Sequence, residues 1–296
     1  MLWQHLNDTL LIVLAATLYL IATPIGNLED ITLRALRILR EEAALIACED
    51  TRQTRKLLDH FEIRKPLVSY HEHNEASRAQ ELIEALERGE PVALVSDAGT
   101  PLVSDPGYRV VHAAIERGLP VVPVPGPSAV LAALAASGLP TDQFRFLGFV
   151  PAKMAARRSM FQELALEQAT VVCYESPHRI LECLMDMAEI LADRPVVLAR
   201  ELTKIHEEFL RGTAGAIRTQ LEERGAVRGE ITLVIGRSTE KPAVADPLAE
   251  IARLQEEGLD RMEAIKAVAK RMGLPKREVY RLAAEQDSNP PGKRRR

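Results

Sequence analysis

The chain has 296 residues, of which 47% are hydrophobic and 27% charged, so its composition is that of a globular protein with room for about two domains. Its net charge of −4 conceals an asymmetry, because the residues from Ala243 onward carry 12 Lys and Arg against 9 Asp and Glu. Cys48, Cys173 and Cys183 form no CxxC pair, which argues against a zinc site or a disulfide framework and favours a reducing, cytoplasmic setting.

The stretch Leu10–Ala22 is almost entirely apolar. No Lys or Arg precedes Arg34, so the basic region of a signal peptide is missing, and the apolar run is too short to span a membrane. We therefore expect an N-terminal extension over residues 1–17 that leads into a buried strand, and no membrane as a partner.

The most informative stretch is Val92–Gly107, VALVSDAGTPLVSDPG. Its first four residues show no alternation of apolar and polar types, which is typical of a central strand buried on both faces. The small residues that follow leave room for a ligand to approach the backbone amides at the carboxyl end of the strand. Leu18–Leu28 and Val121–Ala129 repeat the pattern. Three such loops at one edge of a sheet predict a shared crevice, whereas a single one would indicate only a turn.

Strands and helices alternate over residues 18–138, which predicts a parallel α/β domain. Two polar clusters lie at expected strand ends. Glu49, Asp50 and Arg52 follow a strand over residues 43–48. These residues take part in chemistry, or Asp50 or Thr51 only caps the next helix. The spacing of His71 and His73 does not match a metal-binding HExxH helix, so we expect a substrate-facing loop or a solvated turn there, and no metal.

A second α/β domain is expected over residues 139–240, with mixed strand directions. Strands are predicted over residues 170–174, 195–200 and 229–236. A helix opens near three basic residues, Lys153, Arg157 and Arg158.

Residues 246–285 predict a small helical unit with a helix-turn-helix outline. Its two apolar stripes are Met262, Ile265, Val268, Ala269 and Met272, and Val279, Tyr280, Leu282 and Ala283. Seven basic residues against two acids between Arg261 and Arg281 favour contact with RNA phosphates, with a solvated hairpin as the alternative. The candidate RNA-binding residues are Lys266, Lys270, Arg271, Lys276, Arg277 and Arg281. If these do not bind RNA, Lys153, Arg157 and Arg158 are the next candidates. Residues 286–296 are expected to form a basic disordered tail.

Seven motifs occur in order between Leu18 and Gly236: TPIGNLEDITLRAL, CEDTRQTRKLL, SYHEHNE, VSDAGTPLVSDPG, PVPGPSA, YESPHR and ARELTKIHEE. By these motifs the chain resembles the bacterial small-subunit ribosomal RNA (cytidine-2′-O)-methyltransferases of the tetrapyrrole-methylase superfamily. The resemblance implies two α/β domains of tetrapyrrole-methylase type, with S-adenosyl-L-methionine held in the cleft between them. It also implies a homodimer whose partner is small-subunit ribosomal RNA within an assembled subunit.

Carried over residue by residue, the resemblance places the methyl donor against Pro24, Ala98, Gly99, Thr100, Val103, Ser128, Ala129, Tyr174 and Leu202. Where tetrapyrrole methylases usually carry Gly-Asp-Pro, this chain has Gly99, Thr100 and Pro101, which argues against a porphyrin substrate. No GxGxxG motif opens a helix, so a pyrophosphate cradle for NAD is not expected.

A methyl group carried on a sulfonium needs neither a metal nor a protein nucleophile, so the protein's main task would be to align a ribose hydroxyl with it. The candidates for a general base are Asp50, Glu49, His71 and His73, with Arg52 positioning a phosphate. Two rival functions stay open. A methylase of a small tetrapyrrole would need no basic helical unit, and a non-catalytic RNA-binding protein would need no donor pocket.

Overall fold

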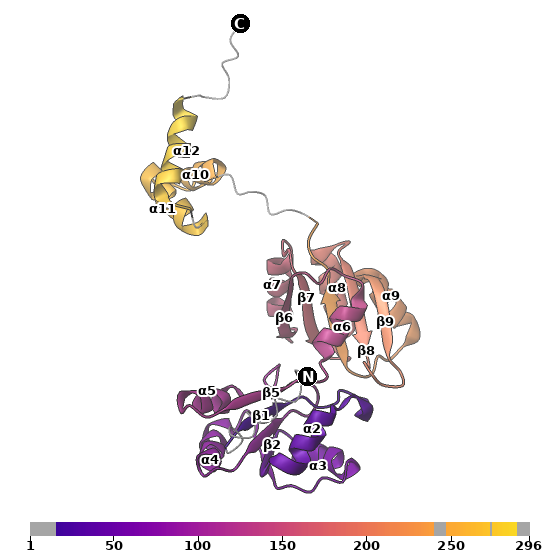
Figure 1. Cartoon of the computed structure of the whole chain (residues 1–296). Helices are drawn as coiled ribbons and strands as arrows, with labels where there is room; N and C mark the ends of the chain where they lie inside the picture. Colours follow the sequence, from indigo (N-terminus) through magenta and orange to yellow (C-terminus); the bar gives the residue numbers. More distant parts are fainter. Residues whose placement is uncertain (1–15, 240–246, 273, 289–296) are drawn as a thin grey trace, which may run out of the picture. The chain divides into compact units, whose positions relative to one another are not determined.

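The computed structural model describes residues 16–239, 247–272 and 274–288 (Figure 1). Contacts divide the chain into two compact units, Met1–Arg237 and Ser238–Arg296. The extension expected over residues 1–17 and the tail expected over residues 286–296 lie largely outside the described residues. Among the residues described, no helix is long and apolar enough to cross a membrane.

The first sheet of the larger unit consists of five parallel strands in the spatial order β3-β2-β4-β1-β5. The strands are β1 (Leu18–Ile21), β2 (Leu45–Cys48), β3 (Leu67–Ser69), β4 (Val92–Val95) and β5 (Val121–Val124). The predicted parallel α/β arrangement is therefore confirmed. All four residues of β4 are buried, because β4 is the central strand of the sheet.

Successive residues of these strands pack on opposite faces of the sheet, so both faces are covered. Ile21 and Val95 contribute to one apolar cluster, and Leu18 and Leu94 contribute to the other. The helical segments of this half are η1 (Leu28–Asp30), α2 (Leu33–Arg37), η2 (Ile38–Glu42), α3 (Thr51–His60), α4 (Glu75–Glu87) and α5 (Tyr108–Glu116). With both faces buried, the loops at the carboxyl ends of the strands are where a ligand can approach.

The second sheet has the order β6-β7-β10-β8-β9. Its strands are β6 (Phe144–Phe149), β7 (Thr170–Glu175), β8 (Pro195–Arg200), β9 (Glu208–Thr213) and β10 (Ile231–Ile235). The pair β6 and β7 is parallel and the other pairs are antiparallel, which confirms the predicted mixed directions. The edge strands β6 and β9 were not predicted. Their sequences interrupt apolar residues with charge and with Gly148 or Gly212, and this weakens the strand pattern.

Helices cover both faces of the second sheet as well (Figure 1). One face packs against α7 (Met154–Leu164), α8 (Ile180–Leu191) and α9 (Ala214–Arg224). The other face packs against α6 (Ala129–Ser137), the helix that directly follows β5 of the first sheet. The chain thus crosses from one sheet to the other at α6, close to the loop that carries Pro127 and Ser128.

The smaller unit contains three helices among its described residues: α10 (Pro247–Glu256), α11 (Arg261–Met272) and α12 (Lys276–Ser288). Ile251 of α10 joins Ile265, Val268 and Val279 in one buried cluster. The sequence had predicted the last two helices, but not α10 as a separate helix. Two residues of the predicted apolar stripes are exposed, Met262 by 47% and Tyr280 by 53%, and Met272 and Leu282 are half-buried.

Candidate functional site

The loops that follow β1 and β4 are joined by hydrogen bonds at the carboxyl ends of these strands. The amide of Thr23 donates to the carbonyl of Gly99, and the amide of Gly99 donates to the carbonyl of Thr23, both at 2.9 Å. Gly99 has a φ of +85°, which favours glycine. The amide of Gly99 is therefore already hydrogen-bonded within the protein.

A cavity of about 440 Å³ lies beside these loops; we call it the central cavity. It is lined by residues from both sheets and their loops: Ile25, Asp97, Ala98, Val103, Ser104, Asp105, Ala129, Phe149, Tyr174, Glu175, Ser176, Pro177, Gly229, Glu230, Ile231 and Thr232. Four of the nine predicted donor-site residues are among them, namely Ala98, Val103, Ala129 and Tyr174. The three stretches from which the sequence predicted a shared crevice all contribute residues to the central cavity: Ile25, Ala98 and Ala129.

The other five predicted donor-site residues do not line the central cavity. Thr100 links two loops, because its hydroxyl donates to the carbonyl of Pro127 at 3.3 Å. Ser128 caps α6, and its hydroxyl accepts from the amide of Leu131. Leu202 is buried in the apolar cluster that includes Tyr174. Gly99 and Pro24 belong to the two joined loops, but neither lines the cavity.

One side of the central cavity is aromatic. The ring of Tyr174 lies edge-on to Phe146 and Phe149, with ring centroids 5.0 and 5.3 Å apart. Phe149 is 60% exposed, which is unusual for so large an apolar side chain. This side offers rings against which a flat heterocycle can pack.

The other side of the cavity is acidic, and sequence reasoning had not singled out its members. Asp97 and Asp105 belong to the loop after β4, and the carboxylate of Asp97 accepts the amide of Asp50 at 3.1 Å. Burial, reinforced by the charges of Glu49 and Asp97, raises the pKa of Asp105 to about 6. Among the residues that the structure describes, the carboxyl group of Asp105 has no hydrogen-bond partner. The signal was present in the sequence, since the motif VSDAGTPLVSDPG contains both aspartates.

Two backbone positions next to Asp105 adopt left-handed conformations. Leu102 has a φ of +71° and Ser104 a φ of +64°, and such values are unfavourable for residues other than glycine. Between them Val103 enters the wall of the central cavity, and Asp105 follows directly. The turn with these two left-handed residues is therefore the segment that brings Val103 and Asp105 to the cavity wall.

Asp50 caps α3, as one of its two predicted alternatives stated. Its carboxylate accepts the amide of Arg52 at 2.8 Å and pairs with the guanidinium of the same residue at 3.0 Å. These hydrogen bonds hold the pKa of Asp50 below its usual range. Burial and the charge of Asp97 instead raise the pKa of the nearby Glu49. None of the three residues is part of the cavity lining.

His71 and His73 lie in the loop after β3, with ring centroids 6.0 Å apart. The amide of His71 donates to the side chain of Asn74 at 2.8 Å, and Nε2 of His71 lies 3.2 Å from Nδ2 of Asn74. Neither histidine lines the central cavity. Within the described residues, no group of three or more His, Cys, Asp or Glu side chains could hold a metal ion.

The loop after β8 reaches the first loop of the chain, a contact that the sequence did not predict. A side chain at Gly26 would overlap with Lys204, so the two segments pack directly on each other. The ammonium of Lys204 donates to Glu201 at 2.8 Å and to Glu230 at 3.2 Å. Since Glu230 lines the central cavity, Lys204 connects the TPIGN loop with the cavity wall.

The six predicted RNA-binding residues lie exposed on α11 and α12. Arg271 is already engaged, because its guanidinium pairs with Glu250 at 2.6 Å. The alternative basic set is largely engaged too. Arg157 is buried and pairs with Asp186 at 2.7 Å, and Arg158 pairs with Asp186 and Glu189. The hypothesis that Arg157 faces RNA is therefore wrong, because its side chain holds α7 and α8 together.

The chain is similar to known proteins in both sequence and structure. The family model "Tetrapyrrole (Corrin/Porphyrin) Methylases" matches residues 17–218. Ribosomal RNA small subunit methyltransferase I of Halalkalibacterium halodurans is 48% identical over 273 residues, which cover 90% of this chain and 94% of that protein. A crystal structure of uroporphyrin-III-C-methyltransferase from Thermus thermophilus has a TM-score of 0.53 at 24% identity, covering 75% of this chain and 94% of that one. Another, complexed with S-adenyl homocysteine, has a TM-score of 0.51 at 20% identity, covering 74% and 97%.

Proposed function

Because the chain belongs to the tetrapyrrole (corrin/porphyrin) methylase family, we propose that it transfers a methyl group from S-adenosyl-L-methionine to the ribose 2′-hydroxyl of a cytidine in small-subunit ribosomal RNA. The relative from Halalkalibacterium halodurans, named for small-subunit ribosomal RNA, matches this chain over nearly its whole length. This likeness supports RNA as the substrate over a small tetrapyrrole.

The composition of the central cavity carries the proposal on the structural side. S-adenosyl-L-methionine combines a flat adenine with a cationic sulfonium, and it supplies an activated methyl group when bound. The aromatic side of the cavity, with Tyr174 and Phe149, suits the adenine, and the carboxylates of Asp97 and Asp105 suit the positive charge. The volume of about 440 Å³ lies in the range of small-molecule sites.

The two sheets take different parts in the proposed site. Residues 18–138 supply the donor-binding loops, residues 139–240 complete the wall, and residues 246–285 contact RNA. Pro24, Gly99, Thr100, Ser128 and Leu202 hold the loops in place, and Ala98, Val103, Ala129 and Tyr174 contact the donor.

In the proposed reaction, the ribose oxygen forms a bond to the methyl carbon, and the carbon–sulfur bond breaks with its electrons remaining on sulfur. The hydroxyl proton must go to an acceptor. Asp105 is the best placed, because it lines the cavity and its pKa of about 6 leaves it mostly ionised, yet a good base, near neutral pH. Glu49 acts through its charge on Asp105, whereas Asp50, Arg52, His71 and His73 shape the neighbouring loops.

We also propose that the protein acts as a homodimer in the cytoplasm on RNA within the assembled subunit. Tyr108 and Ile115, exposed by 69% and 62% on α5, offer apolar surface that a second copy would cover. Sedimentation of the purified protein tests this part, since a monomer at micromolar concentration would contradict it.

Calorimetry with S-adenosyl-L-methionine tests the donor site. Ala98→Leu fills the central cavity and should weaken donor binding at least about tenfold, because the extra atoms occupy ligand space. Ala155→Leu, at an exposed position of α7, is the matched control and should bind as the parent does. Equal binding by both variants would place the donor elsewhere, and no binding by the parent protein would contradict the proposed function.

A further inference from the structure

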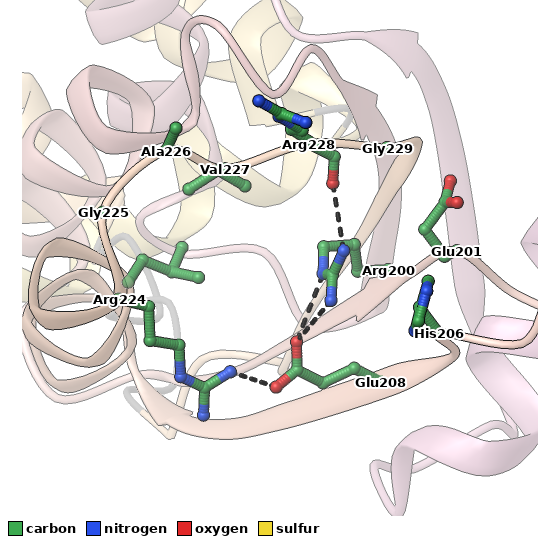
Figure 2. Close-up of a pocket in the computed structure, with 11 residues that line it drawn as sticks. Arg200, Glu201, His206, Glu208, Arg224, Gly225, Ala226, Val227, Arg228 and Gly229 are labelled. Carbon is green, nitrogen blue, oxygen red and sulfur yellow. Dashed lines mark hydrogen bonds and ion pairs between the residues drawn. The ribbon is translucent and has the colours of Figure 1, made fainter.

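A second cavity, of about 310 Å³, lies between β8, β9 and the loop after α9 (Figure 2). We call it the arginine cavity. Its lining residues are Arg200, Glu201, His206, Glu208, Leu221, Arg224, Gly225, Ala226, Val227, Arg228 and Gly229. Gly229 also lines the central cavity, and Glu230, the next residue, does so as well. The two cavities are therefore neighbours.

The backbone that separates the two cavities is held firmly. The guanidinium of Arg200 donates to the carbonyl of Arg228 at 3.1 Å (Figure 2). Glu201 accepts the amide of Glu230 at 2.9 Å, and its carboxyl group lies where a side chain at Gly229 would be. Gly229 also has a φ of +92°. Contacts on both sides thus fix the segment that presents Arg228.

Both carboxylates of the arginine cavity are already paired. Glu208 lies between Arg200, at 3.1 Å, and Arg224 (Figure 2). Partial burial works to raise the pKa of Glu208, but hydrogen bonds from Arg224 and Arg200 outweigh it and hold this pKa below its usual range. Glu201 pairs with Lys204, which lowers its pKa as well. Neither acid is left to neutralise a further positive charge.

Side chains with unused N–H donors remain around this cavity. Arg224 uses one nitrogen for Glu208 and is 52% exposed. In the part of the chain that the structure describes, the guanidinium of Arg228 and the ring of His206 have no hydrogen bond or ion pair, and both residues are exposed. Three side chains with free N–H donors therefore surround a cavity whose acids are satisfied. Guanidinium groups match phosphate oxygens in geometry and charge.

We propose that the arginine cavity binds a phosphodiester group of the RNA substrate, close to the nucleotide whose ribose enters the central cavity. This assignment rests on the proposed function, because it takes RNA as the substrate. Arg228 and Arg224 donate to the phosphate oxygens, and His206 adds a third contact. The shared residue Gly229 places the contact beside the reaction, whereas the basic helices α11 and α12 belong to a separate compact unit.

The test compares Arg228→Gln with Arg218→Gln. Arg218 is a matched control, because it is a partly exposed arginine on α9 that pairs with Glu222 and does not line the cavity. RNA binding is measured without methyl donor over a series of salt concentrations. Arg228→Gln should weaken RNA binding about tenfold and flatten the log–log salt slope by about 0.7 to 0.9, the value for one lost phosphate contact. The affinity for S-adenosyl-L-methionine should not change.

A substrate-side measurement identifies the phosphate. Neutral methylphosphonate is placed at single positions flanking the target cytidine, and one position should weaken binding to the parent protein but not to Arg228→Gln. Unchanged affinity and slope in Arg228→Gln, or equal losses at every position for both proteins, would overturn the assignment. Methyl transfer by the parent protein is scored separately. Its absence would contradict the proposed function, while the binding comparison still decides the phosphate site.

Discussion

Asp105 combines two properties that set it apart from the other acids near the central cavity. It lines the cavity, and within the described residues its carboxyl group has no hydrogen-bond partner. By contrast, Asp97 accepts an amide, Glu175 pairs with Arg179, and Glu230 pairs with Lys204. An acid that burial and like charge have moved to a pKa of about 6 suits proton transfer near neutral pH.

Asp105→Asn should lower the turnover number about a hundredfold, because the proton acceptor is lost, and should weaken donor binding much less, because Asp97 still supplies negative charge for the sulfonium. The kcat/KM of the parent protein should rise with pH through about 6, as Asp105 of the ligand-free protein ionises. A parent profile that is flat between pH 5 and 7, or full activity of the variant, would remove Asp105 from the proposed mechanism.

The same substitution makes a prediction about stability. A carboxyl group whose pKa is higher in the folded state stabilises the fold below its unfolded pKa of about 4, and this contribution is lost as pH rises through about 6. Asn does not ionise, so the variant should gain stability relative to the parent between pH 4 and 7. The expected gain is about 1 kcal/mol, less than the full shift implies because Asp105 is only partly buried. Urea denaturation at pH 4 and pH 7 measures it.

The sequence predicted the loops that border the central cavity, but it did not single out Asp97 and Asp105 as site residues. Asp50 stood next to a basic residue at a strand end, which is typical of both a cap and a site, and the structure shows a cap. Asp105 lies in Val92–Gly107, the stretch from which the ligand site was predicted, but no neighbouring residue distinguishes it from an ordinary turn residue. Its raised pKa depends on burial in the folded protein and on the charge of Glu49, which comes from a distant part of the chain.

At the scale of elements, α6 and β9 show the limits of local patterns. The apolar residues of α6 predict a helix but not its partner, and the partner is the second sheet. Strand β9 carries Arg211, whose guanidinium donates to the carbonyls of Ala136 and Ser137 at the end of α6, at 2.6 and 3.2 Å. The guanidinium also lies 4.9 Å from the ring centroid of Phe209. The charge of Arg211 made β9 hard to recognise as a strand in the sequence. In the structure the same side chain joins β9 to α6.

Arg211→Ala should therefore reduce the free energy of unfolding by about 1 to 2 kcal/mol, because two carbonyls at a helix C-terminus lose a charged donor. Arg218→Ala, which removes only a partly exposed ion pair on α9, should change it by less than about 0.5 kcal/mol. Guanidinium chloride denaturation measures both. Equal effects of the two substitutions would show that the contact of Arg211 with α6 contributes no more to the free energy of unfolding than the ion pair of Arg218 does.

At the scale of the whole molecule, length indicated about two domains, the order of strands and helices predicted two α/β halves, and the charge distribution predicted a basic end. The structure has two sheets within one compact unit and three described helices in a second unit. Helix α10 could not be predicted from the same signals. Of its apolar residues only Ile251 is buried against α11 and α12, and Leu248 and Leu254 are partly buried there. The helices α11 and α12 were predictable because their apolar stripes keep the helical period through Val268 and Val279.

Neutralising Lys270, Lys276 and Arg277 together should weaken RNA binding and flatten its salt dependence by up to about 0.9 for each lost contact. Arg271 is left in place, because it pairs with Glu250 inside the helical unit. Affinity for S-adenosyl-L-methionine should stay at the parental value. A triple variant with parental RNA affinity and salt slope would assign the helical unit a role in folding or assembly.

The position of the transferred methyl group tests the central claim most directly. The protein is incubated with methyl-labelled S-adenosyl-L-methionine and small-subunit ribosomal RNA, either bare or assembled, and the product is hydrolysed with alkali and mapped. A 2′-O-methyl group protects the adjoining phosphodiester, so the label should appear in an alkali-resistant dinucleotide that begins with cytidine. Label on a base, label in an added tetrapyrrole, or no label in either form of RNA would contradict the account.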